Sequence, residues 1–167
     1  MNETAKLIRT ERLEIVDEAG QCMAEIGKGE DQIVGINLYD NLKKVRMRLR
    51  IRENNCPQIT LHDSGGYPRI RLLLNKDDEL KIQFCDRAGD ALLKLALDED
   101  GQLLIELRDE DEATKIAFLV NEAGKGVVAI FDDNGNPISS LPKERDLYDY
   151  IGTASKLINI IRAVSGN

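Results

Sequence analysis

The sequence predicts a mainly β fold, a twelve-strand antiparallel meander of six 23-residue hairpin repeats followed by a carboxyl-terminal amphipathic helix. The first observation is an aspartate that ends an alternating apolar run and recurs every 23 residues, at Asp17, Asp40, Asp63, Asp86, Asp109 and Asp132. The second is apolar alternation with period two on both sides of each aspartate, which is typical of strands. The third is a change to a helical period after Pro142.

Each repeat is expected to hold two strands whose apolar side chains share one face. Relative to each aspartate, the positions four and two before it and seven and nine after it carry the pattern. These 24 positions are apolar except for Ser139. They are Leu13, Ile15, Ala24, Ile26, Ile36, Leu38, Met47, Leu49, Ile59, Leu61, Ile70, Leu72, Ile82, Phe84, Leu93, Leu95, Ile105, Leu107, Ile116, Phe118, Val128, Ile130, Ser139 and Leu141.

The connections between strands carry turn residues at fixed places. Within a repeat, pairs such as Gly65-Gly66 and Asn134-Gly135 suit a two-residue primed turn, whereas Leu42-Lys43 and Asp111-Glu112 suit it poorly. Between repeats, the sequence predicts three-residue loops that end in a left-handed residue, at Glu53-Asn54-Asn55, Glu99-Asp100-Gly101 and Glu122-Ala123-Gly124. With these loop lengths, the predicted strand pairing places Ile82 opposite Leu95 and Phe84 opposite Leu93. A parallel solenoid remains an alternative, but the turn residues favour hairpins.

A sheet with one apolar face is expected to cover that face. The sheet could curl into a barrel, pack against a second copy, or form a prism of three copies. Because a sheet of twelve strands usually curls or splits, we expect a barrel or a curved sheet. The opposite face also becomes apolar in repeats four to six, so that end of the sheet should be covered on both faces. Its residues are Leu73, Leu92, Ala96, Leu104, Leu119, Val127, Ala129 and Phe131.

Residues 1–142 are therefore interpreted as the repeat domain, and residues 143–167 as a helix packed on it or on a partner copy. An apolar stripe along this helix is the candidate interface, with Leu147, Ile151, Leu157, Ile158 and Ile161 as its members. Two hypotheses remain open. The helix could lie on the outward face of the last three hairpins, or it could form a bundle with copies of itself.

Composition limits the possible functions. The net charge of −7 argues against general attraction to nucleic acid or anionic lipid. The absence of a secretory or transmembrane pattern makes a cytoplasmic protein the expectation. The three cysteines form no CxxC pair, and the single histidine, His62, has no second histidine for a metal site or triad. We expect no enzyme, cofactor or metal, and we expect the repeated aspartates to bond turn amides rather than form a calcium ladder.

One pattern indicates chemistry. Arginines alternate with apolar residues in the segment KKVRMRLRIRE, so that Arg46, Arg48, Arg50 and Arg52 should line one face of a strand. The predicted register adds Arg69, Arg71, His62 and Tyr39 to the same region. Guanidinium groups suit phosphate or carboxylate partners, so this arginine comb could bind an anion or a phospholipid head group. In the alternative interpretation, the arginines are solvated and pair with neighbouring carboxylates.

Two resemblances follow from the hairpins. Units such as RLEIVDEAGQCMAEI and GVVAIFDDNGNPI resemble the hairpins of the LURP-one-related and tubby-like proteins. That resemblance implies a twelve-stranded barrel around a carboxyl-terminal helix and, for some members, phosphoinositide binding. The units also resemble tandem DxxGxxR hairpin repeats of uncharacterised bacterial proteins, best matched by Gly65-Gly66-Tyr67-Pro68-Arg69. This second resemblance implies no activity.

The sequence therefore favours a non-enzymatic structural or interaction module that self-associates or binds a protein partner. An anion-binding module that uses the arginine comb is the alternative. No specific nucleic-acid partner is expected.

Overall fold

The computed structural model describes residues 9–28, 33–52, 55–97, 101–120 and 124–141. These residues form twelve strands and no helix. The strands are β1 (Arg12–Val16), β2 (Cys22–Lys28), β3 (Val34–Tyr39), β4 (Val45–Ile51), β5 (Pro57–His62), β6 (Pro68–Leu74), β7 (Leu80–Cys85), β8 (Ala91–Leu97), β9 (Leu103–Arg108), β10 (Thr114–Val120), β11 (Gly126–Phe131) and β12 (Pro137–Leu141). The predicted helix over 143–167 lies outside the described residues.

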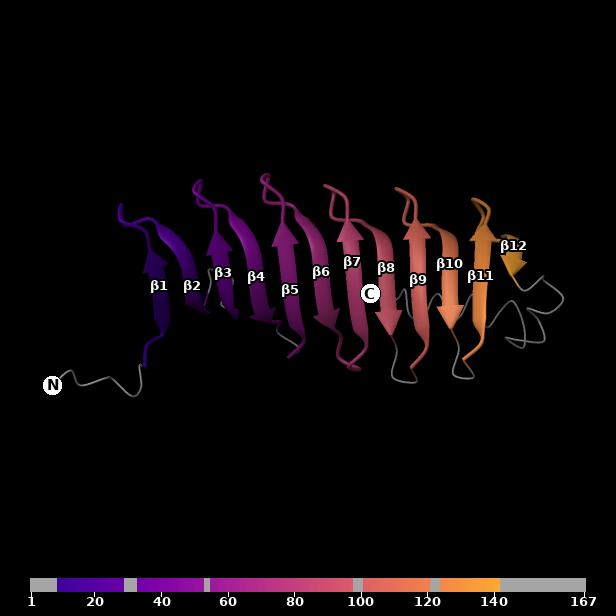
Figure 1. The fold of residues 1–167 in the computed structure, drawn as a ribbon, viewed down its shortest axis with the longest axis horizontal. Coiled ribbons are helices and arrows are strands. Elements are labelled where there is room, and N and C mark those ends of the chain that lie inside the picture. The colour runs from indigo at the N-terminus through magenta and orange to yellow at the C-terminus, as the bar shows by residue number, and fades with distance from the viewer. Residues whose placement is uncertain (1–8, 29–32, 53–54, 98–100, 121–123, 142–167) are drawn as a thin grey trace.

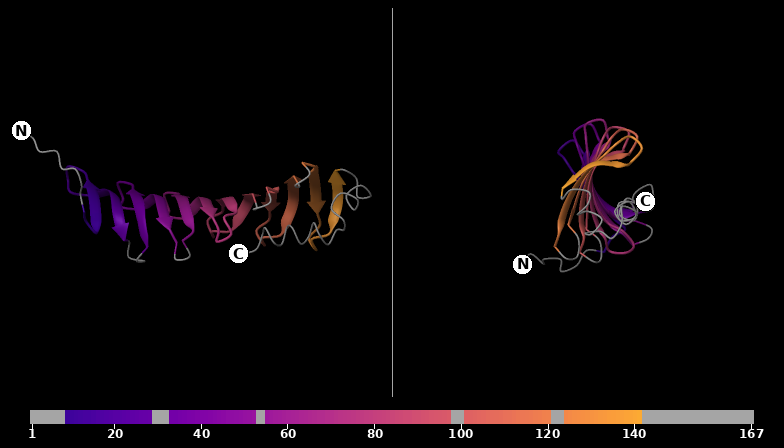
Figure 2. Two further views of the ribbon diagram at one scale, coloured as in Figure 1. Left: turned by 90° about the horizontal axis from the view of Figure 1, so that it is seen from below. Right: turned by 90° about the vertical axis from the view of Figure 1, so that its right-hand side faces the viewer.

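All twelve strands form one antiparallel sheet in sequence order, which confirms the predicted meander (Figure 1). The sheet does not close into a barrel, because β1 and β12 stay at its two edges. Instead the strands bend along their length, so that the sheet viewed down its long axis is an open C (Figure 2). The expectation of a barrel was therefore wrong, and the curved sheet is the observed form.

The predicted register is confirmed along the whole sheet. Ile82 pairs with Leu95 and Phe84 pairs with Leu93, as the 23-residue spacing requires. The same pattern holds between repeats, where Leu61 of β5 pairs with Met47 of β4. The 24 repeat positions thus form two parallel rows that cross all twelve strands on one side of the sheet, here called the apolar face.

The turns within the repeats differ from the two-residue primed turns that the sequence predicted. In the first repeat the Asp17 amide donates to the Gln21 carbonyl at 2.9 Å, and the Gly20 amide donates to the Asp17 carbonyl at 3.0 Å. This is a three-residue loop with a bulge, in which the last loop residue has positive φ. The predicted register survives because the bulge absorbs the extra residue.

Two repeats place a residue with a Cβ atom where this turn requires positive φ. Lys43 has a φ of 61° and Glu112 a φ of 60°, whereas glycine fills the equivalent place in the other four repeats. Left-handed backbone costs an L-residue about 1 kcal/mol relative to glycine. We therefore expect Lys43→Gly and Glu112→Gly each to raise the free energy of unfolding by up to about 1 kcal/mol in urea denaturation. Leu42→Gly is the control and should give no gain, since Leu42 does not have positive φ.

The repeated aspartates close these turns, as the sequence predicted. Oδ1 of Asp40 accepts hydrogen bonds from the amides of Leu42 and Lys44 at 2.9 and 3.0 Å. The Lys44 amide is the main reason that the pKa of Asp40 lies below its usual range. In the described residues, no group of three or more His, Cys, Asp or Glu side chains is placed to hold a metal ion.

Side chains from one turn also reach the next repeat. Nε of Arg46 donates to the carbonyl of His62 at 3.1 Å, and Nε of Arg69 donates to the carbonyl of Cys85 at 2.8 Å. The same two arginines lie 3.5 Å from the carboxylates of Asp40 and Asp63 in their own turns. In these two repeats, the turn aspartate and the arginine six residues after it thus connect one hairpin to the next.

The burial of the two faces is the reverse of what the sequence predicted. None of the 24 positions on the apolar face is buried, and twelve of their apolar side chains are at least 36% exposed. The most buried side chains lie on the opposite face, which we call the concave face, because the curl of the sheet encloses it (Figure 2). Alternation showed which side chains share a face, but it did not show which face the folded chain shields from water.

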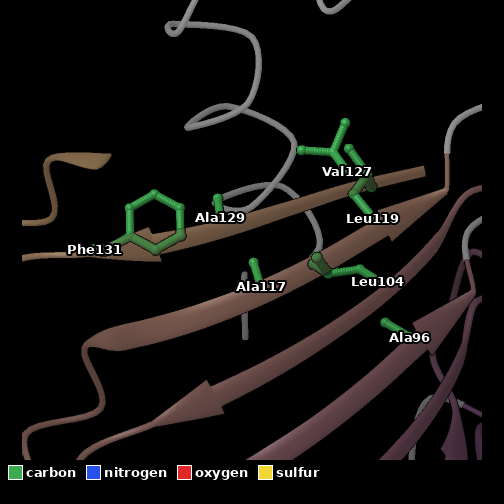
Figure 3. Close-up of a cluster of buried hydrophobic side chains, with 7 residues drawn as sticks. All are labelled: Ala96, Leu104, Ala117, Leu119, Val127, Ala129 and Phe131. Atoms are coloured by element: carbon green, nitrogen blue, oxygen red, sulfur yellow. The ribbon is translucent and has the colours of Figure 1, made fainter. Parts of the chain in front are cut away.

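The concave face carries an apolar cluster at its carboxyl-terminal end (Figure 3), where the sequence predicted a sheet covered on both faces. Its members are Ala96, Leu104, Ala117, Leu119, Val127, Ala129 and Phe131, and all are at most 6% exposed. Leu73 and Leu92, which the sequence placed in the same group, are half-buried. In the described residues, no helix is long and apolar enough to cross a membrane.

Candidate functional site

The concave face of the first four strands forms a pocket of about 560 Å³. Its lining residues come from β1 to β4 and from the residue that precedes β3. They are Arg12, Glu25, Lys28, Ile33, Gly35, Asn37, Tyr39, Val45, Arg48 and Arg50. Four of these are cationic at neutral pH and one is a carboxylate, although the whole chain carries a net charge of −7.

Glu25 is the carboxylate among the described lining residues, and its neighbours hold it in place. Oε2 of Glu25 lies 2.7 Å from the Arg12 guanidinium, and Oε1 accepts a hydrogen bond from Nδ2 of Asn37 at 2.6 Å. Burial acts to raise the pKa of Glu25, but these donors and Tyr39 outweigh burial, so the pKa is lowered. Burial and the hydrogen bond to Glu25 raise the pKa of Tyr39 to about 12. Glu25 is therefore ionised and paired at neutral pH.

Two arginines of the predicted comb line this pocket. Nε of Arg48 donates to Oδ1 of Asn37 at 2.8 Å, and Nε of Arg50 donates to Oε1 of Gln58 at 3.0 Å. Both acceptors are neutral amides, and these two bonds orient the guanidinium groups.

The rest of the comb lies outside this pocket. Arg46 and Arg69 connect successive turns, and NH1 of Arg71 donates to the carbonyl of Gly89 at 3.0 Å. The ring nitrogens of His62 lie 3.0 Å from the Thr60 hydroxyl and 3.0 Å from the Gly66 carbonyl. The structure therefore separates the predicted comb into a pocket pair, Arg48 and Arg50, and a group that supports the turns.

One glycine, Gly35 of β3, lines the pocket. In the sheet it pairs with Gly27 of β2 and with Arg50 of β4. A Cβ atom on Gly35 would lie 2.5 Å from the backbone oxygen of Leu49, so the close approach of β4 leaves no space for a side chain there.

A second group of charges is buried farther along the same face. Lys94 of β8 and Glu106 of β9 are direct cross-strand partners with exposed fractions of 2% and 0%, and Nζ lies 3.9 Å from Oε2. Oε1 of Glu106 also accepts a hydrogen bond from the Thr114 hydroxyl at 2.7 Å. Burial lowers the pKa of Lys94 to about 8, although attraction to Glu106 acts to raise it. This pair borders the apolar cluster and supports the sheet.

The apolar face is the second candidate surface. Twelve of its apolar repeat positions are at least 36% exposed, and these are Leu13, Ile15, Ile26, Ile36, Leu38, Leu49, Leu61, Leu72, Phe84, Phe118, Ile130 and Leu141. They belong to the two rows of repeat positions and come from ten of the twelve strands, and the row positions between them are partly exposed. Soluble monomers rarely expose apolar patches larger than a few hundred Å². The predicted helix interface, Leu147, Ile151, Leu157, Ile158 and Ile161, lies outside the described residues.

Sequence reasoning did not identify the pocket. The sequence pattern singled out Tyr39, Arg48 and Arg50, but not Arg12, Lys28, Glu25 or Gly35. The predicted register already aligned Arg12, Gly27, Gly35 and Arg50 across four strands. That row was a usable signal for Arg12, Gly35 and Arg50, but the register does not specify that these residues enclose a pocket.

Comparisons with known proteins give no family. No protein-family model matches the chain, and no curated protein matches it. Among solved structures, the chain is similar to a mutant of TarM from S. aureus in complex with fondaparinux, alpha-GlcNAc-glycerol and UDP, with a TM-score of 0.42 and 11% identity. The match covers 74% of this chain and 22% of that chain.

Proposed function

We propose that this protein is a non-enzymatic structural module that associates with a second copy of itself through the apolar face. The observation that carries the proposal is that none of the 24 positions in the two rows across the twelve strands is buried, and that twelve of their apolar side chains are at least 36% exposed. Burying such side chains contributes roughly 25 cal/mol per Å², and no charged residue stands among the 24 positions to oppose their burial.

The dimensions of the two rows suit a stable dimer. Neighbouring strands lie about 4.8 Å apart, so twelve strands make a strip roughly 50 Å long. A strip about 15 Å wide would bury roughly 800 Å² on each partner, which is the standard size of a specific protein interface. Two such faces can pack as aligned sheets. A second copy is the favoured partner because an isologous contact matches an apolar row with an apolar row.

The test is the mass of the full chain in solution. Sedimentation equilibrium should show a concentration-dependent dimer for the natural chain. The double variant Leu61→Glu with Phe84→Glu should be a monomer, because both side chains lie in the middle of the apolar face and are 39% and 47% exposed. Leu42→Glu is the matched control, because Leu42 is a turn residue with 70% exposure, and this variant should still dimerise.

Circular dichroism must show that each variant keeps its β structure. A natural chain that is monomeric up to about 100 µM would overturn the proposal, since dimers with standard interfaces form at lower concentrations. So would a folded double variant whose mass equals that of the natural chain. If the natural chain forms an assembly larger than a dimer and the double variant does not, the apolar face is still the interface, but the number of copies differs from two.

A further inference from the structure

We propose that the concave face of β8 to β11 is the docking surface for the carboxyl-terminal segment of the same chain, residues 143–167. The apolar stripe of that segment would lie against the apolar cluster. Its members are Leu147, Ile151, Leu157, Ile158 and Ile161. This inference concerns the concave face and does not depend on self-association through the apolar face.

The apolar cluster is buried although the described strands form a single layer. Ala96 and Leu104 are 0% and 1% exposed, and Val127, one strand from the edge of the sheet, is 3% exposed. All the described strands belong to this one sheet, so none of them forms a second layer over the cluster. A sheet face is shielded from water when another element packs on it. The cover therefore comes from outside the described residues.

The bend of the strands does not by itself explain this burial. The strands bend at both ends of the sheet (Figure 2), but equivalent positions of different repeats are buried to different degrees. Glu106 is 0% exposed, whereas Asn37, which also lies three residues before its repeat aspartate, is 9% exposed. Lys94 is 2% exposed, whereas its equivalent Arg48 is half-buried. Shielding is thus greatest at the end of the sheet that carries the cluster.

Two polar atoms on the concave face support a cover at this end of the sheet. Nε of Arg108 on β9 and Oγ of Ser140 on β12 are shielded from water and have no hydrogen-bond partner among the described residues. Ser140 pairs with Ala129 of the cluster, and β12 is the edge strand. Water would reach a hydroxyl on an edge strand if nothing lay over it.

The carboxyl-terminal segment fits this surface in position, length and shape. It follows Leu141, the last residue of β12, which lies beside the cluster strand β11. A helix of about twenty residues is roughly 30 Å long and 10 Å wide, and four strands span about 15 Å, so one helix can cross the cluster. A second copy fits less well, because two concave faces of this curvature do not meet along their centres.

Acetylation of lysines in the folded full chain, followed by mass spectrometry, tests the cover from the side of the sheet. Lys94 should react at least about tenfold more slowly than the exposed Lys43, because close packing excludes the reagent. Ile158→Asp should raise the rate at Lys94 at least about tenfold, because a carboxylate in the apolar stripe opposes docking. Asn159→Asp is the matched control, since it adds the same side chain one residue away, off the stripe, and should leave the rate unchanged.

Circular dichroism must show that both variants keep their β structure. Equal reaction rates of Lys94 and Lys43 in the natural chain would overturn the proposal. An unchanged rate in Ile158→Asp would also overturn it, because the cover would then be another element. So would an equal rise in Asn159→Asp, because protection would then not depend on the stripe.

The double variant Leu61→Glu with Phe84→Glu separates this inference from the proposed function. Its substitutions lie on the apolar face, on the other side of the sheet from Lys94. Unchanged protection of Lys94 in a folded, monomeric double variant supports a cover that belongs to the same chain. Loss of protection in that monomer would overturn the proposal, because the cover would then come from a partner copy. A natural chain that is monomeric but protects Lys94 would refute only the proposed self-association.

Discussion

Glu106→Ala is expected to lower the free energy of unfolding by about 3–5 kcal/mol, because it removes the cross-strand carboxylate from a lysine that water cannot reach. Lys94 is 2% exposed, and its partner Glu106 is fully enclosed. The variant would also remove the acceptor of the Thr114 hydroxyl, which donates to Glu106 at 2.7 Å. Urea denaturation followed by circular dichroism measures the effect.

The double variant Lys94→Met with Glu106→Leu is the control for this prediction. Because it removes both charges and keeps apolar volume, it should recover most of the stability that Glu106→Ala loses. If the double variant is no more stable than Glu106→Ala, the loss comes from packing and not from the unpaired charge. A stability of Glu106→Ala within about 1 kcal/mol of the natural chain would contradict the role of the pair, since removing one partner of a buried pair normally costs more.

Gly35→Ala is expected to have the next largest effect on stability, a loss of about 1–3 kcal/mol. The new Cβ would lie 2.5 Å from the backbone oxygen of Leu49 and 3.2 Å from Cβ of Arg50. Real side chains do not make contacts as short as the first of these, so β3 and β4 would have to move apart. Thermal unfolding should show the loss as a lower Tm.

Gly126→Ala is the matched control, since Gly126 begins strand β11 and no heavy atom lies within 4 Å of the place that its Cβ would occupy. This variant should be neutral or slightly stabilising, because alanine restricts the unfolded chain. Equal losses in the two variants would show that the cost is a general property of strand glycines. The close approach of β3 and β4 at the pocket would then not be the cause.

The 23-residue repeat determines much of this fold. The spacing of the aspartates predicted twelve strands, their antiparallel order and the pairing of Ile82 with Leu95. These features could be predicted because register depends on local alternation and turn length, and both can be read from the chain. The turn type was wrong in detail, since a bulge with a left-handed third residue replaces the primed turn.

The candidate site could be predicted less well. The alternation of arginines identified Arg48 and Arg50 as neighbours on one face, and the structure places both in the pocket. The same pattern gave equal weight to Arg46 and Arg69, which instead bond the carbonyls of the next repeat. The partner of a long flexible side chain depends on which groups lie near it in the folded chain. Spacing along the sequence does not give those distances.

By itself, then, the sequence determined which side chains share a face and which strands are neighbours, because a period of two and a fixed repeat length specify both. The tertiary structure alone decided which face is enclosed. The side with Glu106 and Leu104 is buried, whereas the rows with Leu61 and Phe84 are exposed to water. Alternation separates the two faces of a sheet, but it does not specify which of them the folded chain shields.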